Sequence, residues 1–435
     1  MKRTVSVAEE ATTEQVLPVG VQEALGELVG VAQEGLLALS VGVGLGVLHT
    51  LMEEEVDEVV GPRGRHDPER SASRHGREDG SVTLGGRRVA VSRPRARGVD
   101  GGAEVPLVTY AHFADRDPLS QVVLERMLAG VSTRRFARTQ EPVGEEVEAG
   151  ARSQSRSAVS RTFIERTRAA LGELMARRLD DVRLAVLMLD GIDLKGRTNV
   201  VCLGITTEGV KIPLGLWEGS TENAAVATAL LADLVDRGLD TSQGLLAVLD
   251  GSKALRKAVS DVLGDVPVQR CQRHKERNVL DHLPDRDRAT VKRRLRTAWK
   301  LDDHVAAEQR LRVLVGELER THPGAAASLG EGLAETLTIT RLGVTGALRK
   351  TLASTNPIES MIECVRRSSR NVKRWQNGEM ALRWTAAGML EAEQQFRKVI
   401  GYTDLAKLAI AIEGDLAAQQ VAPTPTTETP TPVTV

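Results

Sequence analysis

The alternation of apolar runs with amphipathic stretches is clearest between residues 184 and 271. Short uninterrupted apolar runs are typical of strands buried on both faces, and apolar residues at helical spacing are typical of helices packed on a sheet. We expect three strands, a helix, a strand, a helix and a strand, at 184–190, 198–205, 209–216, 222–237, 244–249, 253–263 and 267–271. This order predicts an α/β sheet covered by helices.

After residue 271 the pattern is helical almost to the end of the chain. Residues 272–345 read as helix, with interruptions near Pro284 and Pro323, because proline ends or kinks a helix. Thr355 or Asn356 then caps a helix that carries Glu359. The element order before residue 271 is that of a ribonuclease H-like fold. We therefore interpret the chain as such a core, made of 181–271 and 346–400, with an all-helical insertion at 272–345.

The first 180 residues are divided into three segments. Residues 1–60 predict acidic helices, and residues 61–105 predict a basic linker or a small β-hairpin that turns at Gly85-Gly86. Residues 106–180 predict a mainly α-helical DNA-binding region. Within this region we expect one helix to begin at 132–135 and another at 155–161. The two helices either form a helix-turn-helix or simply pack against their neighbours. At the other end, 401–435 predict a helix and a disordered tail rich in proline and threonine, 422–435.

The net charge of −1 conceals a strong segregation of charge along the chain. Residues 1–60 hold 2 basic and 11 acidic residues, whereas residues 266–300 hold 11 basic and 4 acidic. Residues 366–374 hold five basic residues and no acid. Clustered positive charge indicates a polyanionic partner, and ordinary solvated helix faces are the alternative.

Cysteine usage and hydropathy indicate the compartment. Cys202, Cys271 and Cys364 are too few and too scattered for a disulfide framework, so a reducing cytoplasm is expected. The 18 uncharged residues between Glu34 and Glu53 include glycines and polar residues. They predict a buried or partner-facing helix rather than a membrane span.

Three acidic residues stand where metal chemistry is expected. Asp190 and Asp250 each end an apolar run and precede a glycine, and Glu359 lies in a predicted helix. Ligands gather at the strand ends of open α/β sheets, and three carboxylates supply the hard oxygen ligands that two Mg²⁺ ions need beside a phosphate. Each acid also has an ordinary explanation: a turn at Asp190, a helix cap at Asp250, and a capping box in which Asn356 pairs with Glu359.

Several stretches resemble motifs of the mutator-type transposases of bacterial insertion sequences, and they follow one another in the order that this family has. The family has a DDE ribonuclease H-like core. They span about residues 184–400, with a weaker likeness at 130–134 and 155–161. The stretches are 189–191 (LDG), 195–197 (KGR), 214–223 (LGLWEGSTEN), 236–239 (DRGL), 250–255 (DGSKAL), 269–280 (QRCQRHKERNVL) and 354–360 (STNPIES) with the basic run after it.

By this resemblance, Asp190, Asp250 and Glu359 correspond to the catalytic, metal-binding triad of the family, with two Mg²⁺ or Mn²⁺ ions as cofactor. Cys271 and His274 correspond to its Cys-x-x-His element. Such a pair is half a zinc site, but no second pair lies at a suitable spacing. We therefore expect no zinc and a structural role beside the active site. Whether Asp193 or Glu363 assists stays open.

The sequence thus predicts a DNA transposase of an insertion sequence, which binds terminal inverted repeats and target double-stranded DNA and catalyses strand cleavage and strand transfer. Cut-and-paste and copy-out routes both remain open. A homodimer or higher homo-oligomer at the nucleoid is expected, because two element ends must be joined. The alternatives are a ribonuclease H-like nuclease or resolvase without strand transfer, and a non-catalytic DNA-binding relic or repressor.

Contacts with DNA are expected from the basic residues of the predicted DNA-binding helices and of the two basic clusters. Lysine and arginine neutralise backbone phosphates, so DNA binding would depend strongly on salt. The expected DNA-binding residues are Arg134, Arg135, Arg156, Arg161, Arg273, Lys275, Arg277, Arg366, Arg367, Arg370, Lys373 and Arg374.

Overall fold

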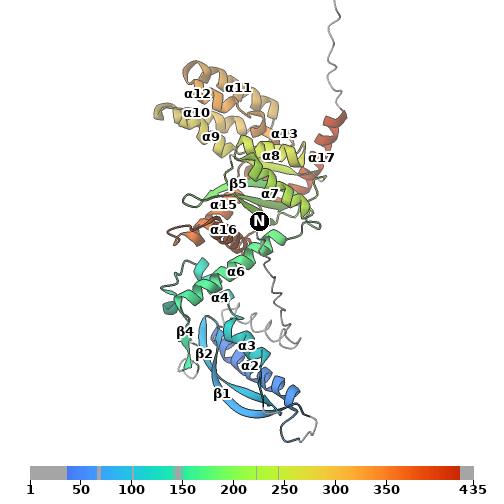
Figure 1. The fold of residues 1–435 in the computed structure, drawn as a ribbon. Helices are drawn as coiled ribbons and strands as arrows, with labels where there is room; N and C mark the ends of the chain where they lie inside the picture. Colours follow the sequence, from blue (N-terminus) through green and yellow to red (C-terminus); the bar gives the residue numbers. More distant parts are fainter. Residues whose placement is uncertain are drawn as a thin grey trace, which may run out of the picture. The chain divides into compact units, whose positions relative to one another are not determined.

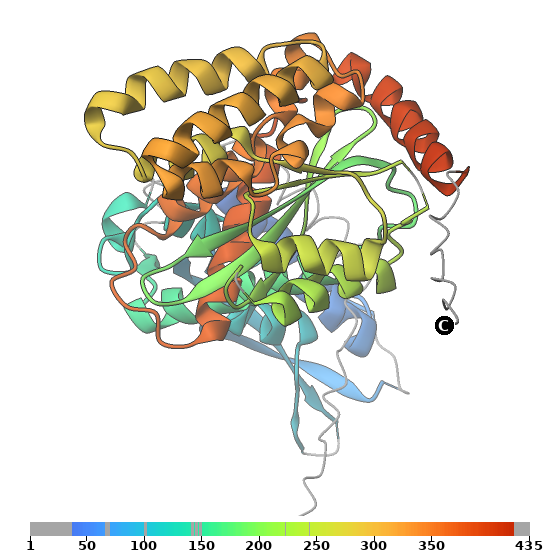
Figure 2. The ribbon, with the colours of Figure 1, turned by 90° about the horizontal axis from the view of Figure 1, so that it is seen from above.

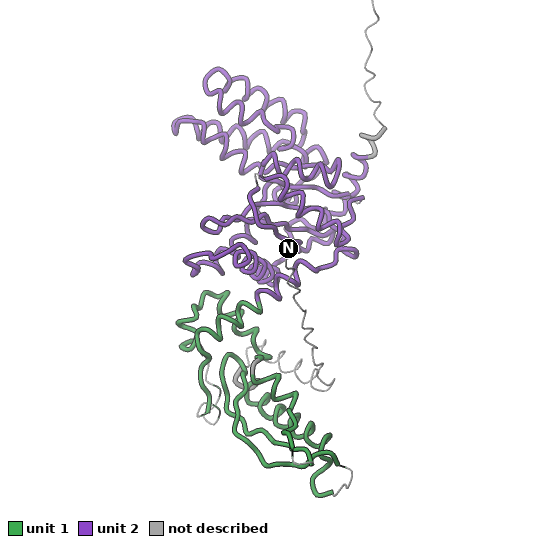
Figure 3. Tube along the Cα trace, in the orientation of Figure 1, with its two compact units in different colours: residues 1–166 green, residues 167–435 purple. Residues whose placement is uncertain are grey.

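The chain forms two compact units, residues 1–166 and residues 167–435, which are coloured separately in Figure 3. The computed structural model describes residues 37–65, 70–99, 102–140, 143, 147, 150–221, 223–242 and 244–421. The predictions for residues 1–36 and for the tail lie outside the described residues. The seven segments expected from the sequence divide the chain more finely than these two units, and their boundaries stay predictions.

The first unit is built on a β-hairpin that is longer than the sequence pattern indicated. β1 (Ala72–Leu84) pairs antiparallel with β2 (Arg87–Gly98), and the turn lies at Gly85 and Gly86. Both glycines have positive φ angles, 60° and 78°, which glycine adopts without steric cost. Sequence alternation was visible only over 81–91, because residues 73–81 are exposed or half-buried on both faces of β1.

Two helices cover one face of this hairpin (Figure 1). α2 (Leu37–Val60) buries Met52 and Val56, and α3 (Val108–Asp115) buries Phe113. Residues 37–52 of the uncharged stretch before Glu53 therefore belong to a helix packed on a sheet. None of the helices among the described residues combines the length and the apolar character needed to cross a bilayer.

Several arginines of the hairpin are buried or paired with acids. Arg87 is buried, while Arg93 and Arg95 form ion pairs with Glu78 and Glu104. The antiparallel register places Arg93 opposite Glu78 on the neighbouring strand. Cross-strand pairing therefore neutralises much of the positive charge of this basic segment.

The expected pair of short helices in the DNA-binding region is not present in that form. Ser132 to Arg135 form a turn rather than the start of an α-helix, and a short 3₁₀ helix follows, η1 (Phe136–Thr139). The second segment begins a long helix, α6 (Arg156–Ala176), which crosses the division between the two units. Because η1 is a single 3₁₀ turn that buries Phe136, these two segments do not make a helix-turn-helix. Between them, several residues at 141–149 lie outside the described part of the chain.

The second unit contains a five-stranded mixed sheet in the order β7-β6-β5-β8-β9. Neighbouring strands among β5, β6 and β7 are antiparallel, whereas β5, β8 and β9 run parallel. The elements follow the predicted order within a few residues: β5 (Leu184–Asp193), β6 (Thr198–Thr206), β7 (Lys211–Glu218), α7 (Ala224–Asp236), β8 (Leu246–Leu249), α8 (Lys253–Leu263) and β9 (Val268–Arg270). β5 extends past its predicted end, because its pairing with β6 continues to Asp193 after its pairing with β8 stops.

Helices cover both faces of this sheet. On one face, α7 and α8 enclose an apolar cluster that includes Leu189, Val200 and Leu255. On the other face lie α15 (Asn356–Ser369) and α16 (Gly378–Gln394). There Asn199 of β6 donates a hydrogen bond to Thr385 of α16, with 3.0 Å between Nδ2 and Oγ1.

The residues between β9 and α14 form a separate helical block, residues 272–345, which Figure 2 shows gathered beside the sheet. It has an apolar core of its own, which includes Leu295, Leu311 and Leu329. The block separates the strand before Asp250 from the helix that carries Glu359. Its elements and those that follow are α9 (Gln272–Asp281), α10 (Asp285–Trp299), α11 (His304–Thr321), α12 (Pro323–Gly330), η2 (Ala334–Leu337), α13 (Thr338–Arg341), α14 (Gly346–Leu352), and, after α16, η3 (Tyr402–Asp404) and α17 (Leu405–Val421).

Candidate catalytic site

The register of two parallel strands brings Asp190 and Asp250 to one edge of the sheet. Leu189 of β5 lies opposite Leu249 of β8, and these are the last residues of that pairing. The next residue on each strand is therefore an aspartate. One oxygen of Asp190 accepts a hydrogen bond from the Gly191 amide at 2.7 Å, and one oxygen of Asp250 accepts from the Ser252 amide at 2.8 Å.

The glycine after each aspartate has a packing reason. A Cβ on Gly191 would lie 2.8 Å from Cγ2 of Thr221, and a Cβ on Gly251 would lie 2.4 Å from Nε of Arg270. Gly251 also has a φ angle of 110°, which L side chains rarely adopt. The repeated Asp-Gly pattern thus reflects crowding beside two acidic side chains, and the turn alone does not explain it.

Glu359 enters the site from the first turn of α15. Thr355, one of the two caps considered from the sequence, is the N-cap of this helix, so the alternative explanation of Glu359, a capping box with Asn356, does not hold. Instead, the hydroxyl of Thr355 donates a hydrogen bond to Oε1 of Glu359 at 2.9 Å. Arg273 lies on the other side of the carboxylate, with 3.8 Å between Nη1 and Oε2.

The three carboxylates act on one another electrostatically. Burial, together with the negative charges of Asp250 and Glu359, raises the pKa of Asp190 from 3.8 to about 6, although the Gly191 amide and His274 oppose this rise. Like charges in a partly desolvated site disfavour ionisation. Asp250 and Glu359 are therefore near enough to Asp190 for their charges to act on it, while the role of each acid stays a prediction.

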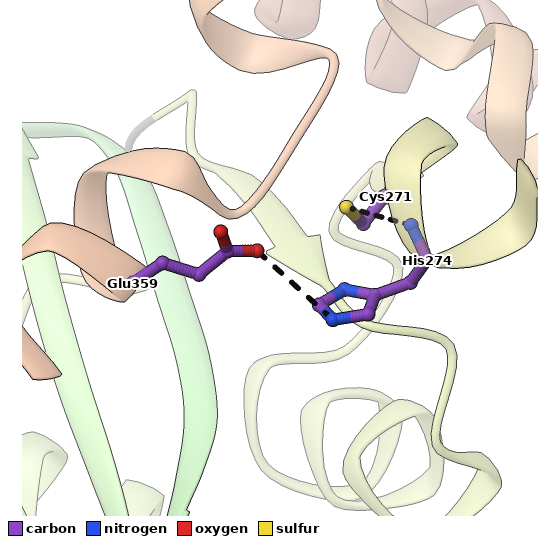
Figure 4. Close-up of side chains that lie close together, drawn as sticks. All are labelled: Cys271, His274 and Glu359. Atoms are coloured by element: carbon purple, nitrogen blue, oxygen red, sulfur yellow. Dashed lines mark hydrogen bonds and ion pairs between the residues drawn. The ribbon is translucent and has the colours of Figure 1, made fainter. Parts of the chain in front are cut away.

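Cys271 and His274 lie against Glu359, at the N-terminus of α9 (Figure 4). The Cys271 sulfur accepts hydrogen bonds from the His274 amide and the Thr355 amide, each at 3.5 Å. The Thr355 hydroxyl oxygen also lies 3.5 Å from the sulfur, but its single proton is donated to the nearer Glu359 oxygen. Nε2 of His274 lies 4.0 Å from Oε1 of Glu359. One ligand atom from each of Cys271, His274 and Glu359 lies within 4.8 Å of the other two.

These contacts perturb both members of the Cys-x-x-His element. Burial alone would raise the pKa of the Cys271 thiol, but hydrogen bonds with His274 and Thr355 outweigh burial and lower it. The hydrogen bond with Cys271 and the charges of Asp190 and Asp250 raise the pKa of His274, against the effect of burial. The element is thus electrostatically coupled to the triad.

Lys275 does not face solvent as the sequence interpretation required. Its side chain is buried, and Nζ donates to the carbonyl oxygens of Ser328 and Glu331, each at 2.6 Å. Burial and the nearby Arg270 lower the pKa of Lys275 to about 8. Lys275 therefore ties α9 to α12 and the residue after it, and it is not available to a DNA phosphate.

The other predicted DNA-binding residues are exposed. In the first unit these are Arg134, Arg135, Arg156 and Arg161, and in the second unit they are Arg273, Arg277, Arg366, Arg367, Arg370, Lys373 and Arg374. Within the described part of the chain, Arg277, Arg366, Arg370, Lys373 and Arg374 form no ion pair.

Sequence reasoning missed two residues that support the site. Thr355 was considered only as a helix cap, yet its buried hydroxyl contacts Cys271, His274 and Glu359. Arg270 is buried beneath the turn after Asp250 and donates to the carbonyl oxygens of Gly251 and Glu331. The position of Thr355 four residues before Glu359 was the available signal, because residues four apart share a helix face.

Comparisons with known proteins find transposases, and the matches extend over most of the chain. Residues 32–399 match the family model described as "Transposase, Mutator family". The chain is 26% identical over 371 residues to the transposase for insertion sequence element IS256 in transposon Tn4001 of Staphylococcus aureus, covering 82% of this chain and 91% of that protein. It is 27% identical over 365 residues to the transposase for ISRM5 of Rhizobium meliloti (strain 1021), covering 82% and 89%. It is also 32% identical over 174 residues to the transposase for IST2 of Acidithiobacillus ferrooxidans, covering 40% and 58%.

Proposed function

The chain belongs to the Mutator family of transposases, and on that premise we propose that it is a DDE-type enzyme that cleaves and joins DNA strands at the ends of an insertion sequence. Two observations support the proposal: the register of β5 and β8 places Asp190 beside Asp250, and Glu359 of α15 is near enough for its charge to raise the pKa of Asp190. The three acids are separated by 60 and 109 positions along the chain, so closeness in sequence does not explain their closeness in space.

The arrangement of the second unit supports a ribonuclease H-like core. Three antiparallel strands are followed by two strands parallel to the first, and helices lie on both faces. Asp190 and Asp250 come directly after the last paired residues of two adjacent parallel strands, at the strand ends where ligands gather in open α/β folds. The helical block enters between the second and third acids, where it leaves the strand pairing intact.

The donor set fits divalent metal, and we propose two Mg²⁺ or Mn²⁺ ions held by Asp190, Asp250 and Glu359. All three residues offer hard carboxylate oxygens, the ligands that Mg²⁺ prefers. Burial chiefly, and the negative charges of Asp250 and Glu359 in addition, raise the pKa of Asp190, and a bound cation would offset both effects. Bound there, such ions supply activation of the attacking oxygen and stabilisation of charge on the leaving oxygen.

The residues around the triad have separable tasks in this proposal. Arg273 is exposed and lies beside Glu359, so its guanidinium suits the phosphate next to the reacting one. Arg277 and the exposed residues Arg366, Arg370 and Lys373 would hold DNA backbone phosphates. The exposed arginines of the first unit would contribute to recognition of the terminal inverted repeats. Pairing of two ends requires at least two copies of the chain.

Charge-removing variants of the aspartates test the proposal. Asp190→Asn and Asp250→Asn should each abolish nicking of an end-bearing duplex in Mg²⁺, while binding of that duplex, measured by mobility shift, remains. Asp193→Asn is the matched control, because Asp193 lies on the same strand but is exposed. Nicking at the wild-type rate in both aspartate variants would remove the triad assignment.

Joining of a labelled end to a plasmid separates the reaction classes. A transposase produces joined molecules in which the element end is covalently attached to the target. A nuclease or resolvase of the same fold produces nicks without joined molecules. A DNA-binding relic produces neither, although it still shifts the end-bearing duplex.

A further inference from the structure

We propose that Cys271, His274 and Glu359 form a second cation site, selective for thiophilic divalent ions such as Zn²⁺, and that its occupation inhibits the enzyme by withdrawing Glu359 from the triad. The existence of the site depends only on these three side chains. The inhibitory role rests on the proposed function, in which Glu359 holds the catalytic cations.

The ligand atoms are already close to the separations that such an ion needs. The sulfur, nitrogen and oxygen atoms lie within 4.8 Å of one another, and Nε2 of His274 lies 4.0 Å from Oε1 of Glu359. In a tetrahedral zinc site, bond lengths of about 2.0–2.3 Å place ligand atoms roughly 3.5 Å apart. Contraction by about 1 Å therefore completes three corners of the site, and water can occupy the fourth.

The Cys271 side chain is prepared as a metal ligand. It is fully buried at the N-cap of α9, and two backbone amides, those of His274 and Thr355, donate to its sulfur. Amide donors and the positive end of a helix favour the thiolate, the form of cysteine that binds metal. Because the donors come from α9 and from the turn before α15, the sulfur also joins the two elements that carry the other ligands.

Without an ion, the side chains of Cys271, His274 and Glu359 all have Thr355 as a polar neighbour. Its hydroxyl oxygen lies 3.5 Å from the Cys271 sulfur, 3.4 Å from Nδ1 of His274 and 2.9 Å from Oε1 of Glu359. Residues in contact with metal ligands commonly fix their orientation. Thr355 therefore holds the three side chains together, and Glu359 is the ligand that must exchange its hydroxyl contact for the cation.

The two sites differ in the chemistry of their ligands. Asp190, Asp250 and Glu359 offer only oxygen, which suits Mg²⁺, whereas the second site offers sulfur and nitrogen, which suit Zn²⁺. Glu359 is common to both. Occupation of one site consequently weakens the other, and Mg²⁺ in excess should relieve inhibition by Zn²⁺.

The sequence argument against zinc looked for a second Cys-His pair at short spacing. The third ligand is instead a glutamate 85 positions after His274. The contact between α9 and the start of α15 brings Glu359 close to Cys271 and His274. No local sequence pattern predicts this contact.

Co²⁺ titration of the full chain, after removal of metal, tests the site directly. The wild-type protein should develop a sulfur-to-cobalt charge-transfer band with one equivalent of Co²⁺, and Zn²⁺ but not Mg²⁺ should abolish it. Cys271→Ser should lose the band, while His274→Gln and Glu359→Gln should bind Co²⁺ at least tenfold more weakly. Cys364→Ser is the control, because Cys364 lies outside the cluster, and it should retain the band. Circular dichroism would establish that each variant is folded.

Absence of the band in the folded wild-type protein, or its persistence in Cys271→Ser, would overturn the site. End cleavage in Mg²⁺ tests the inhibitory role separately. Zn²⁺ should reduce cleavage by the wild-type protein, and excess Mg²⁺ should restore it. Undiminished inhibition of a folded, active His274→Gln variant would overturn the role. A cobalt band in a wild-type protein that never cleaves DNA would refute the proposed function and leave the cation site standing.

Discussion

Replacement of Asp190 by asparagine should stabilise the metal-free protein, although the same change should abolish its chemistry. In the absence of metal, the Asp190 carboxylate is half-buried beside Asp250 and Glu359. Asparagine keeps the shape and the amide-accepting oxygen while removing the charge. Active sites commonly sacrifice stability in this way, because function requires like charges to be held together.

The magnitude follows from the shift in the pKa of Asp190, from 3.8 to about 6. One pKa unit corresponds to about 1.4 kcal/mol, so the ionised carboxylate costs the fold roughly 3 kcal/mol at neutral pH. The pKa is higher in the folded state, so the folded state binds the proton more tightly. The contribution of Asp190 to stability is thus fully present below pH 3.8 and is lost as the pH rises through about 6.

Urea denaturation followed by tryptophan fluorescence measures this effect in the relevant unit, because all four tryptophans lie in residues 167–435. In EDTA, the free energy of unfolding of Asp190→Asn should exceed that of the wild type at neutral pH, and the difference should shrink on acidification. Asp193→Asn, which alters an exposed acid on the same strand, should show no such gain. A difference that is absent, or independent of pH, would refute the reasoning. Saturating Mg²⁺ should stabilise the wild type more than the variant.

Three further substitutions test other parts of the structure. Thr355→Val removes the hydroxyl that holds Glu359, so half-maximal cleavage should need more Mg²⁺, and Thr355→Ser should restore the wild-type value; an unchanged Mg²⁺ dependence would contradict this. Lys275→Met removes the donor to the Ser328 carbonyl oxygen, while the Glu331 carbonyl oxygen keeps its hydrogen bond from Arg270, and it should cost about 1–3 kcal/mol of unfolding free energy. It should leave the salt dependence of DNA binding unchanged, whereas Arg277→Met on the same helix should reduce the slope by about one; the reverse result would restore Lys275 as a DNA contact. Burial alone would raise the pKa of Glu53, but Arg74, Arg63 and Arg77 lower it, so its stabilising contribution should disappear as the pH falls below 4.5. Denaturation followed by circular dichroism should show wild type and Glu53→Gln converging in acid; a constant gap would exclude this account.

The sheet of the second unit was predictable because its strands are buried along most of their length. Continuous apolar runs located β5, β6, β7 and β8 within a few residues, and Asp190 and Asp250 were visible as the acids that end two of those runs. The hairpin of the first unit was only partly visible, because most of β1 lacks a buried face.

Pairings between distant residues were not predictable. A lysine in a basic run looks the same whether it faces solvent or, like Lys275, donates to carbonyl oxygens more than 50 positions away. Likewise, the sequence shows Arg93 only as one residue of a basic segment, whereas the register of the hairpin places Glu78 opposite it. Charge counts report residue type, whereas burial and pairing depend on contacts that only the fold creates.

The helical block between β9 and α14 also delays the synthesis of Glu359 relative to that of the two aspartates. Glu359 follows Asp250 by 109 positions, and at about 5–20 residues per second a ribosome needs roughly 5–20 s to add them. Throughout this interval the emerging chain already has its first unit and both aspartates but not the glutamate. Under the proposed assignment, a growing chain acquires the capacity to grip DNA well before the capacity to break it, and a product that terminated within the block would compete for element ends without cutting them.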